Sequence, residues 1–580
     1  MTACVHAQNL RKTFRMADGS AVQALGGVDL EISSGVITAL VGADGAGKTT
    51  FLRMICALMS PDSGTLSVLG EDVRTRAQSV QRRISYMPQR FGLYEDLTVQ
   101  ENLDLYADLH GVPMPERSRR YEKLLSMTDL TAFTARPAGK LSGGMKQKLG
   151  LACTLVRLPE LLVLDEPSVG VDPLSRLELW NIVSALSRQE HLTVLWATSY
   201  MDEAEKADEI AVMHEGRILQ TGSPGELTGR VRGLTFSVAP LPGQKPRELQ
   251  AELYDRAELV ADAVPRVGRV SVVARSAAAV RALQSLYGGR FSGREPRFED
   301  AFMTLIGRTS DARPMYPASA AGSRTGAVQD GVPVIEVRDL VRRFGSFIAV
   351  NRTSFEVGRG EIFGLLGPNG AGKTTTFRML CGLLPASEGS LRVAGCDLRH
   401  AAARARGRIG YVAQKFALYG NLSVRQNLMF FGGAYGLRGQ RLRERVQHAA
   451  SLFSLPLEES AERLALGYKR RLAMAAALLH EPEILFLDEP TSGIDPQARR
   501  EFWRLITHLA AGGITIIVTT HFMEEAEYCD RMAIQDAGRL LALGSPRELL
   551  ERAAGGSARD MNEAFIELVR DARDGEGAHA

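Results

Sequence analysis

The two halves of this 580-residue chain repeat one another. Gly42 and Gly367 are 325 positions apart, and Asp165 and Asp488 are 323 positions apart. Because motifs of different composition recur at almost the same offset, they indicate tandem copies of one domain rather than chance matches. The sequence therefore predicts two domains of the same fold.

Each copy carries a glycine-rich loop of the pattern G-x-x-x-x-G-K-[ST], at residues 42–49 and 367–374. A strand-like apolar run precedes each loop and a helical segment follows it. The backbone N–H groups of such a loop point at phosphate, and the helix N-terminus adds positive charge. Its lysine reaches the β- and γ-phosphates, and its threonine places a hydroxyl on Mg²⁺. The predicted phosphate-binding residues are Gly42, Gly45, Gly47, Lys48, Thr49, Thr50, Gly367, Asn369, Gly370, Gly372, Lys373, Thr374 and Thr375.

An acidic pair ends a buried strand in each copy. The runs at 161–164 and 484–487 are short and continuously apolar, as expected for strands buried on both faces of a parallel sheet. An aspartate at the strand end suits Mg²⁺ binding, and the glutamate after it can polarise an attacking water as a general base. The pattern predicts an α/β fold with phosphoryl-transfer chemistry. The two pairs are Asp165-Glu166 and Asp488-Glu489.

A short L-S-G-G segment at residues 141–144 precedes a helical run in the first copy. Ser142 can cap that helix, and the small glycines leave its N-terminus open to a γ-phosphate. The second copy has L-A-L-G at 464–467 instead. It lacks the capping hydroxyl and carries a bulky leucine, so both the cap and the close approach to phosphate are compromised.

Taken in order, these motifs resemble the ATP-binding subunits of ABC transporters. The order is the loop, Gln89 or Gln414, L-S-G-G, the strand with Asp-Glu-Pro, and a Thr-Thr-His segment ending at His521. The resemblance covers most of both halves. It implies an α/β fold of two tandem P-loop ABC ATPase domains, each with a mostly parallel sheet core and a helical signature subdomain. In that family two domains sandwich two ATP molecules with Mg²⁺, and each site joins the loop of one domain to the signature of the other.

The resemblance also implies roles for individual residues. The implied catalytic residues are Glu489, His521, Gln414, Ser142 and Glu166. The implied Mg²⁺ ligands are Thr49, Gln89, Asp165, Thr374, Gln414 and Asp488. Gly144 would face the nucleotide beside Ser142, and Phe14 and Phe344 match the aromatic residue that stacks on adenine. Asp172 and Asp495 match the aspartate of the loop between the domains.

Two departures from the family pattern fall in one site. Ser199 stands where the second copy has His521, and a serine is shorter and carries no charge at neutral pH. The altered signature at 464–467 would serve the same site, because the arrangement is head to tail. Independent variation in a relaxed site is the alternative explanation. We expect the second site to hydrolyse ATP and the first mainly to bind it, in a sandwich formed within one chain.

The chain divides into five parts. They are a first ABC ATPase domain (1–231), an accessory α/β lobe closing it (232–310), a flexible linker rich in Ala, Ser, Gly and Pro (311–332), a second ATPase domain (333–552), and a C-terminal helix and tail (553–580). Phe302 lies 137 positions after Asp165, but Phe565 lies only 77 after Asp488. Most of the accessory strands are therefore expected to be absent after the second copy.

Composition limits the other classes of function. The six cysteines include no C-x-x-C pair, which disfavours a zinc or iron–sulfur site and favours reduced thiols. The net charge of +3 is small for this length and argues against nucleic acid as the main partner. No apolar run approaches the roughly 18 residues of a spanning helix, and no secretory signal is visible. The chain is therefore not expected to cross a membrane by itself, and the resemblance to transporter ATPases implies a cytoplasmic protein attached peripherally to the inner membrane.

Within the family, the chain is similar to fused ATPases of bacterial ABC-2-type exporters. That resemblance implies a separately encoded permease, possible contact with a periplasmic adaptor, and drugs or other xenobiotics as cargo. The aromatic stretches 91–94 and 416–419 would be either core or a docking surface for permease helices. The alternative function is a soluble tandem ATPase acting on the ribosome, although such relatives usually keep both signatures and have a long charged linker. Cysteine spacing disfavours a zinc-bearing DNA-repair ATPase.

Overall fold

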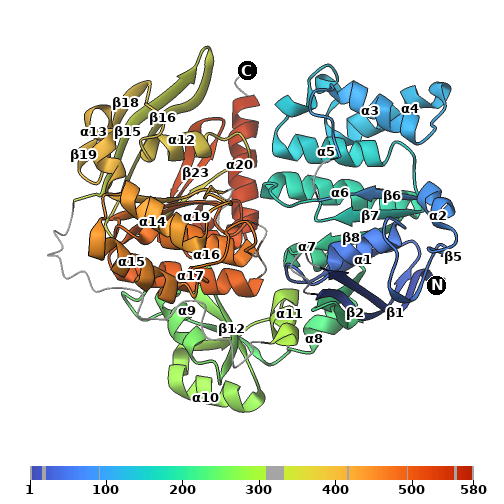
Figure 1. Cartoon of the computed structure of the whole chain (residues 1–580), viewed down its shortest axis with the longest axis horizontal. Coiled ribbons are helices and arrows are strands. Elements are labelled where there is room, and N and C mark those ends of the chain that lie inside the picture. The colour runs from blue at the N-terminus through green and yellow to red at the C-terminus, as the bar shows by residue number, and fades with distance from the viewer. Residues whose placement is uncertain are drawn as a thin grey trace.

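A computed structural model of the chain describes residues 3–15, 21–89, 92–307, 332–414, 417–464, 466–492, 494, 496–553 and 558–577. Two halves lie side by side and head to tail, with a smaller lobe below both of them in the view of Figure 1. Most of the predicted linker, 311–332, falls outside the described residues. In the part of the chain that is described, no helix is long and apolar enough to cross a membrane.

The core of the first half is a six-stranded sheet in the order β10-β9-β3-β8-β7-β6. Its strands pair in parallel except for the edge pair β9 and β10, which is antiparallel. Every residue of β3, β7 and β8 is buried, as the continuous apolar runs predict. The bounds are β3 Ile37–Val41, β6 Ile84–Met87, β7 Leu161–Asp165, β8 Thr193–Thr198, β9 Glu209–His214 and β10 Arg217–Gly222.

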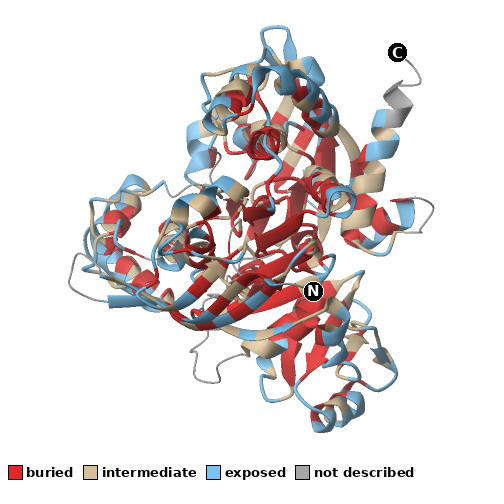
Figure 2. Ribbon diagram, turned by 90° about the vertical axis from the view of Figure 1, so that its right-hand side faces the viewer, coloured by how far each residue is buried: buried red, intermediate tan, exposed pale blue. Residues whose placement is uncertain are grey.

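The second half repeats this sheet in the order β20-β21-β22-β17-β23-β24, again with one antiparallel edge pair. Its strands are β17 Ile362–Leu366, β20 Ile409–Val412, β21 Ile484–Asp488, β22 Thr515–Thr519, β23 Arg531–Asp536 and β24 Arg539–Gly544. Buried residues concentrate in the sheets of both halves (Figure 2). The tandem P-loop ATPase fold expected from the duplication is therefore confirmed.

An antiparallel sheet of four strands flanks each core. In the first half its order is β2-β1-β4-β5, and in the second it is β16-β15-β18-β19. The first set comprises β1 Ala3–Arg15, β2 Ala21–Ser33, β4 Ser63–Val68 and β5 Glu71–Asp72. The second set comprises β15 Ile335–Phe344, β16 Phe347–Val357, β18 Glu388–Val393 and β19 Cys396–Asp397.

A helical subdomain carries the signature segment in each half. In the first, α5 packs against α3 and α4, and in the second α16 packs against α14 and α15. Both subdomains begin with a capping box that fixes the entry of the first helix, at Thr98 and at Ser423. The bounds are α3 Val99–Leu109, α4 Met114–Thr128, α5 Gly143–Thr154, α14 Val424–Ala434, α15 Gly439–Leu452 and α16 Leu466–Leu478.

The accessory lobe is a four-stranded antiparallel sheet, in the order β12-β13-β11-β14, with its own apolar core. Its elements are β11 Thr235–Val238, α9 Pro246–Asp255, β12 Val260–Arg266, β13 Arg269–Ala274, α10 Ala277–Tyr287, β14 Phe291–Gly293 and α11 Phe298–Ile306. After the second half, the described residues contain only α19 Pro546–Arg552 and α20 Met561–Gly577.

The lobe packs on both halves, so the expectation that it only closes the first copy was too narrow. Phe298 and Phe302 of α11 join the core of the first half. On the other side, the guanidinium of Arg500, in α17 (Pro496–Ala511), is fully buried against Asp262 and Glu299 of the lobe. Sequence periodicity could not reveal this contact, because it joins residues more than 200 positions apart.

Glutamates at equivalent positions in the two halves accept hydrogen bonds from backbone N–H groups of the lobe. Glu205 accepts a hydrogen bond from the N–H of Phe298 at 3.4 Å, and Glu527 accepts one from the N–H of Val267 at 2.8 Å. Burial raises the pKa of both carboxyls, that of Glu527 to about 7. The lobe therefore bridges the two halves at one end of their interface, as Figure 1 shows.

Candidate functional site

The glycine-rich loops have the same backbone in both halves. Helix α1 (Lys48–Ile55) and helix α12 (Lys373–Leu380) each begin at the loop lysine. The glycines before them, Gly47 and Gly372, have φ of 103° and 97°, a left-handed conformation that disfavours other residues. A Cβ atom on the first glycine of either loop would collide with a backbone carbonyl of the neighbouring strand. The loops fit the cradle that the motif predicts.

Both loop lysines are buried over the loop carbonyls. Lys48 Nζ donates to the carbonyl of Gly42 at 2.7 Å, and Lys373 Nζ donates to the carbonyl of Gly367 at 2.6 Å. Each lysine is about 6% exposed. Burial lowers the pKa of Lys373 despite the attraction of nearby carboxylates. A buried ammonium is costly unless it is paired, which makes this position favourable for an anion such as phosphate.

The second half gathers its predicted catalytic side chains around Glu489. Gln414 Nε2 donates to Glu489 Oε2 at 2.5 Å, and His521 Nδ1 lies 3.4 Å from the same oxygen. Burial raises the pKa of Glu489, but the His521 bond and charge and the nearby Lys373 outweigh it and lower the pKa overall. Glu489 is therefore held as a carboxylate, the form that can accept a proton from water.

The neighbouring aspartates accept hydrogen bonds from threonines at different positions in the two halves. Thr49 Oγ1 donates to Asp165 Oδ1 at 3.1 Å, while Thr519 Oγ1 donates to Asp488 Oδ1 at 2.6 Å. Burial raises the pKa of both carboxyls. Tyr86, which sequence reasoning missed, donates to Asp165 Oδ2 at 3.0 Å. The position of Tyr86, three residues before Gln89, was the sequence signal that could have revealed this contact.

Glu166 has different partners from Glu489. Its Oε1 lies 3.1 Å from Lys48 Nζ, so the carboxylate pairs with the loop lysine. Ser199 donates to Glu166 Oε2 through its N–H at 3.2 Å and through its hydroxyl at 3.1 Å. Gln89, a predicted Mg²⁺ ligand, lies two residues after β6 and is exposed. The first half thus brings Lys48, Glu166 and Ser199 together.

The signature of the first half faces the loop of the second. A Cβ on Gly143 would lie 3.3 Å from the side-chain amide nitrogen of Asn369. That nitrogen also donates to the carbonyl of Gly170 at 3.3 Å, and the N–H of Asn369 lies 3.5 Å from Asp172 Oδ2. The halves of this site therefore meet within one chain, head to tail.

The predicted roles of Ser142 and Gly144 have local structural support. Ser142 caps α5 by accepting a hydrogen bond from the N–H of Met145 at 3.3 Å. Gly144 packs so closely on Ser175 of helix α6 (Pro173–Glu190) that a Cβ would lie 2.6 Å from the serine hydroxyl. The helix N-terminus is thus held where its N–H groups can receive an anion from the other half.

The corresponding signature of the second half is only partly described. Ala465, the side chain of Leu466 and Asp495 lie outside the described residues. Gly467 is exposed, and a Cβ there would meet no heavy atom within 4 Å. The close packing that holds Gly144 is therefore absent at Gly467.

The aromatic residues expected at adenine lie on the outer sheets. Phe14 is half-buried in β1, with Lys12 Nζ 5.8 Å from its ring centre. Phe344 is 47% exposed at the end of β15, with the Arg342 guanidinium 4.6 Å from its ring centre.

The set of residues fits ATP and Mg²⁺ in the second site. His521 is 2% exposed, and its Nε2 is a buried polar atom without a hydrogen-bond partner among the described residues. Three or more His, Cys, Asp or Glu side chains suited to a metal do not cluster anywhere in the described ranges. Mg²⁺ in nucleotide sites takes few protein ligands, together with water and phosphate oxygens, so Thr374 and Asp488 suffice.

Comparison with known proteins agrees with this geometry. The family described as "ABC transporter" matches residues 25–169 and 350–492. A relative from Escherichia coli (strain K12), "Probable multidrug ABC transporter ATP-binding protein YbhF", is 46% identical over 98% of this chain and 98% of its own length. This chain belongs to the ATP-binding proteins of ABC transporters. It is accordingly an ATPase that binds ATP through both repeated domains.

Two further relatives match one copy each. The "Linearmycin resistance ATP-binding protein LnrL" of Bacillus subtilis (strain 168) is 38% identical over 41% of this chain and 79% of its own length. A solved structure described as "Structure of ATP binding subunit of ABC transporter" is 28% identical. It covers 41% of this chain and 99% of its own, with a TM-score of 0.38.

Proposed function

We propose that this chain energises export by a separately encoded membrane permease, and that its second site performs most of the ATP hydrolysis. The observation that carries the second part is the contrast between Glu489 and Glu166. Glu489 faces Gln414 and His521, whereas Glu166 is paired with Lys48 and Ser199. Both carboxylate oxygens of Glu166 already have protein partners, whereas Gln414 and His521 both contact the same oxygen of Glu489, Oε2.

In the second site, each group has a role in the hydrolysis of the γ-phosphate. Glu489 accepts a proton from the attacking water, and Gln414 orients that water beside it. Lys373 and the loop N–H groups stabilise the negative charge that develops on the phosphate oxygens. When bound, Mg²⁺ would supply positive charge that offsets the charge of the phosphate oxygens. Thr374, Asp488 and Gln414 would hold it.

Residues from both halves complete that site. Ser142 and Gly144 of the first half present a helix N-terminus to the γ-phosphate. In the imidazolium form, His521 donates to the same phosphate through its buried Nε2 and to Glu489 through Nδ1. Phe344 supports the adenine ring by stacking. The product phosphate leaves only when the two halves separate, which would couple hydrolysis to movement of the permease.

We assign the first site mainly to ATP binding. Lys48, Thr49, Asp165 and Gln89 retain the groups that hold phosphate and Mg²⁺, and Phe14 retains the adenine platform. The N–H-rich signature that would close this site is altered at 464–467. ATP held here without rapid turnover would keep the two halves together through several cycles of the second site.

Exposed apolar side chains support a permease as the partner. Tyr94 is 57% exposed, close after Gln89, and Leu93 packs partly against the core. At the corresponding place in the second half, Tyr419 is 47% exposed and stacks edge-on against Phe430 at 5.0 Å. Phe91 and Phe416 lie outside the described residues. Two such patches suit the cytoplasmic helices of an ABC-2-type permease. In this arrangement the chain lies at the cytoplasmic face of the inner membrane. A periplasmic adaptor would contact the permease rather than this chain.

The proposal is tested by capturing the tagged chain from its own cells in mild detergent and identifying co-purifying proteins by mass spectrometry. We expect multi-spanning membrane proteins, and we expect them to be lost when Leu93 and Leu418 are changed to glutamate. Capture of ribosomal proteins without a permease would overturn export and favour action on translation. If the double variant still captured the permease, the docking surface would have to lie on other residues.

A further inference from the structure

Two aromatic rings from different halves stack where the halves meet. Tyr200 directly follows Ser199 in the first half, and Phe522 directly follows His521 in the second. Their ring centres are 5.2 Å apart and their planes are inclined by 19°. Tyr200 is 5% exposed and Phe522 is 6% exposed. The segments that carry the two γ-phosphate positions therefore touch each other directly.

An arginine from the same half lies over each ring. The Arg176 guanidinium, on α6, lies 4.2 Å from the centre of the Tyr200 ring. The Arg499 guanidinium, on α17, lies 4.4 Å from the centre of the Phe522 ring. The two stacked rings and the two guanidinium groups thus form one cluster across the interface, held by cation–π and aromatic contacts.

The imidazole of His521 leans on this stack. Its ring centre is 4.5 Å from that of Phe522, with an interplanar angle of 30°. Apart from its Nδ1 contact with Glu489, its ring nitrogens have no partner among the described residues. The orientation of the imidazole therefore depends on the ring beside it, and that ring is supported by Tyr200 of the other half.

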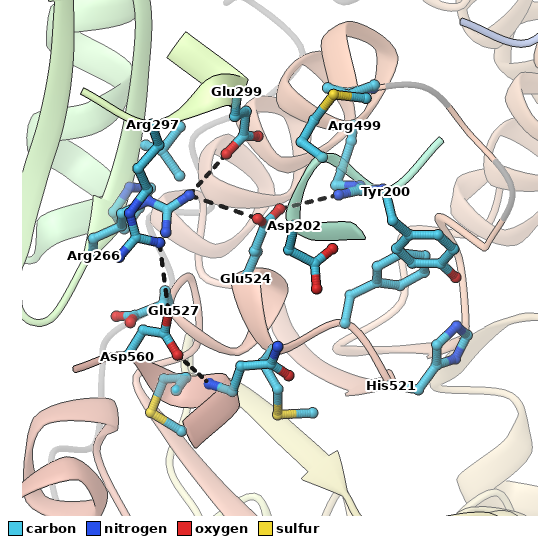
Figure 3. Close-up of a pocket in the computed structure, with 18 of the residues that line it drawn as sticks. Tyr200, Asp202, Arg266, Arg297, Glu299, Arg499, His521, Glu524, Glu527 and Asp560 are labelled. Carbon is cyan, nitrogen blue, oxygen red and sulfur yellow. Dashed lines mark hydrogen bonds and ion pairs between the residues drawn. The ribbon is translucent and has the colours of Figure 1, made fainter. Parts of the chain in front are cut away.

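The accessory lobe braces the stack on the side of the second half (Figure 3). Arg499 pairs with Glu524 at 3.2 Å, and Arg266 of the lobe lies 3.6 Å from the same carboxylate. The corresponding residue of the first half, Asp202, pairs with Arg176 at 2.5 Å. Within the described ranges, Asp202 has no ion pair with a lobe arginine. The extra segment of the first half thus reinforces the neighbourhood of His521 rather than that of Ser199.

We propose that Tyr200 is a positioning residue for the second site: it stacks on Phe522 and thereby fixes the imidazole of His521 beside Glu489. This inference rests on the proposed function, in which the second site hydrolyses ATP. Ser199, the residue before Tyr200, is bonded to Glu166 of the first site. Tyr200 therefore joins the segment bonded to Glu166 of the first site to the ring beside His521 of the second.

Three substitutions at one position test the role. Tyr200→Ala and Tyr200→Leu remove the stacked ring, and we expect each to lower kcat for ATP hydrolysis by about tenfold while KM changes by less than about twofold. Tyr200→Phe keeps the ring, and the Tyr200 hydroxyl has no hydrogen-bond partner among the described residues, so we expect nearly full activity. Leucine fills the space that alanine leaves empty. An equal loss of kcat in Tyr200→Ala and Tyr200→Leu therefore identifies the missing aromatic ring, rather than a cavity, as the cause.

A double-mutant cycle separates positioning from general support of the fold. In a His521→Ala background, measured by single-turnover hydrolysis with enzyme in excess, Tyr200→Ala should cause no further loss, because no imidazole remains to be positioned. Equal losses with and without His521, or an unchanged kcat for Tyr200→Ala, would overturn the inference. Glu489→Gln is measured in parallel. If ATP turnover survived the Glu489→Gln substitution, the assignment of hydrolysis to the second site would be refuted instead.

Discussion

Glu166 and Glu489 occupy the same position in two copies of one fold, and they differ only in what surrounds their side chains. Both residues directly follow a buried strand, and both have a left-handed backbone, with φ of 51° and 45°. Glu166 pairs with Lys48 and Ser199, and Glu489 faces His521 and Gln414. The duplication has preserved the backbone of the site while its chemistry has diverged.

A second difference lies at the surface that receives the accessory lobe. Arg500 of the second half binds Asp262 and Glu299 of the lobe, whereas the corresponding residue of the first half is Leu177. The lobe follows the first half in the sequence, yet its buried ion pairs are with the second. The two halves are therefore specialised at two places, the catalytic carboxylate and the contact with the lobe.

The largest effect is expected when the loop lysines are removed one at a time. Lys373→Ala should lower ATP turnover by roughly 10²–10³-fold, because it removes a positive charge from the phosphate of the hydrolytic site. Lys48→Ala should lower turnover by less than about tenfold, because the first site contributes mainly binding. Steady-state ATPase assays of the purified chain measure both. Losses of similar size would break the contrast between the two sites.

A smaller effect, on stability, is expected when Arg500 is replaced by the residue of the other half. Arg500→Leu leaves Asp262 and Glu299 buried with a missing partner, which should cost about 3–5 kcal/mol in free energy of unfolding. Denaturant titration of the full chain, following the unfolding of the second half and the lobe, measures the loss of unfolding free energy. Arg338→Leu is the control: Arg338 is exposed and pairs only at 3.7 Å, so its loss should cost at most about 1 kcal/mol. Equal costs would contradict docking through Arg500.

The smallest effect concerns the pH dependence of the lobe contact. Burial raises the pKa of Glu527 from 4.5 to about 7. Between these values the folded chain keeps a proton that the unfolded chain releases, so stability should fall as pH rises toward 7. The total loss is of the order of 3 kcal/mol by linkage. Glu527→Gln, which still accepts from the N–H of Val267, should flatten the profile of unfolding free energy against pH; an unaltered slope would contradict this.

Much of the fold could be predicted because local signals repeat. The apolar runs before Asp165 and Asp488, the loops and the offset between them specify the tandem sheets. The lobe's contacts could not be predicted in this way. Arg247 and Asp530, for example, pair at 2.9 Å although 283 positions separate them. Such pairs depend on how finished domains dock, and neither periodicity nor turn chemistry carries that information.

The candidate site shows the same division. The loop pattern pointed to Lys373 and the strand end to Glu489, while the resemblance to the family pointed to His521. Tyr200 escaped notice, since an aromatic residue after Ser199 has no distinctive local pattern. Its partner Phe522 lies on the other half and is recognisable only once the halves are placed head to tail.

One pair of variants tests the central claim most directly: ATP hydrolysis by Glu489→Gln and by Glu166→Gln, measured in the purified chain under identical conditions. Both substitutions remove a carboxylate and keep the size of the side chain. The unequal sites predict that Glu489→Gln nearly abolishes turnover and that Glu166→Gln leaves much of it. Equal losses from the two changes, or a larger loss from Glu166→Gln, would contradict the account.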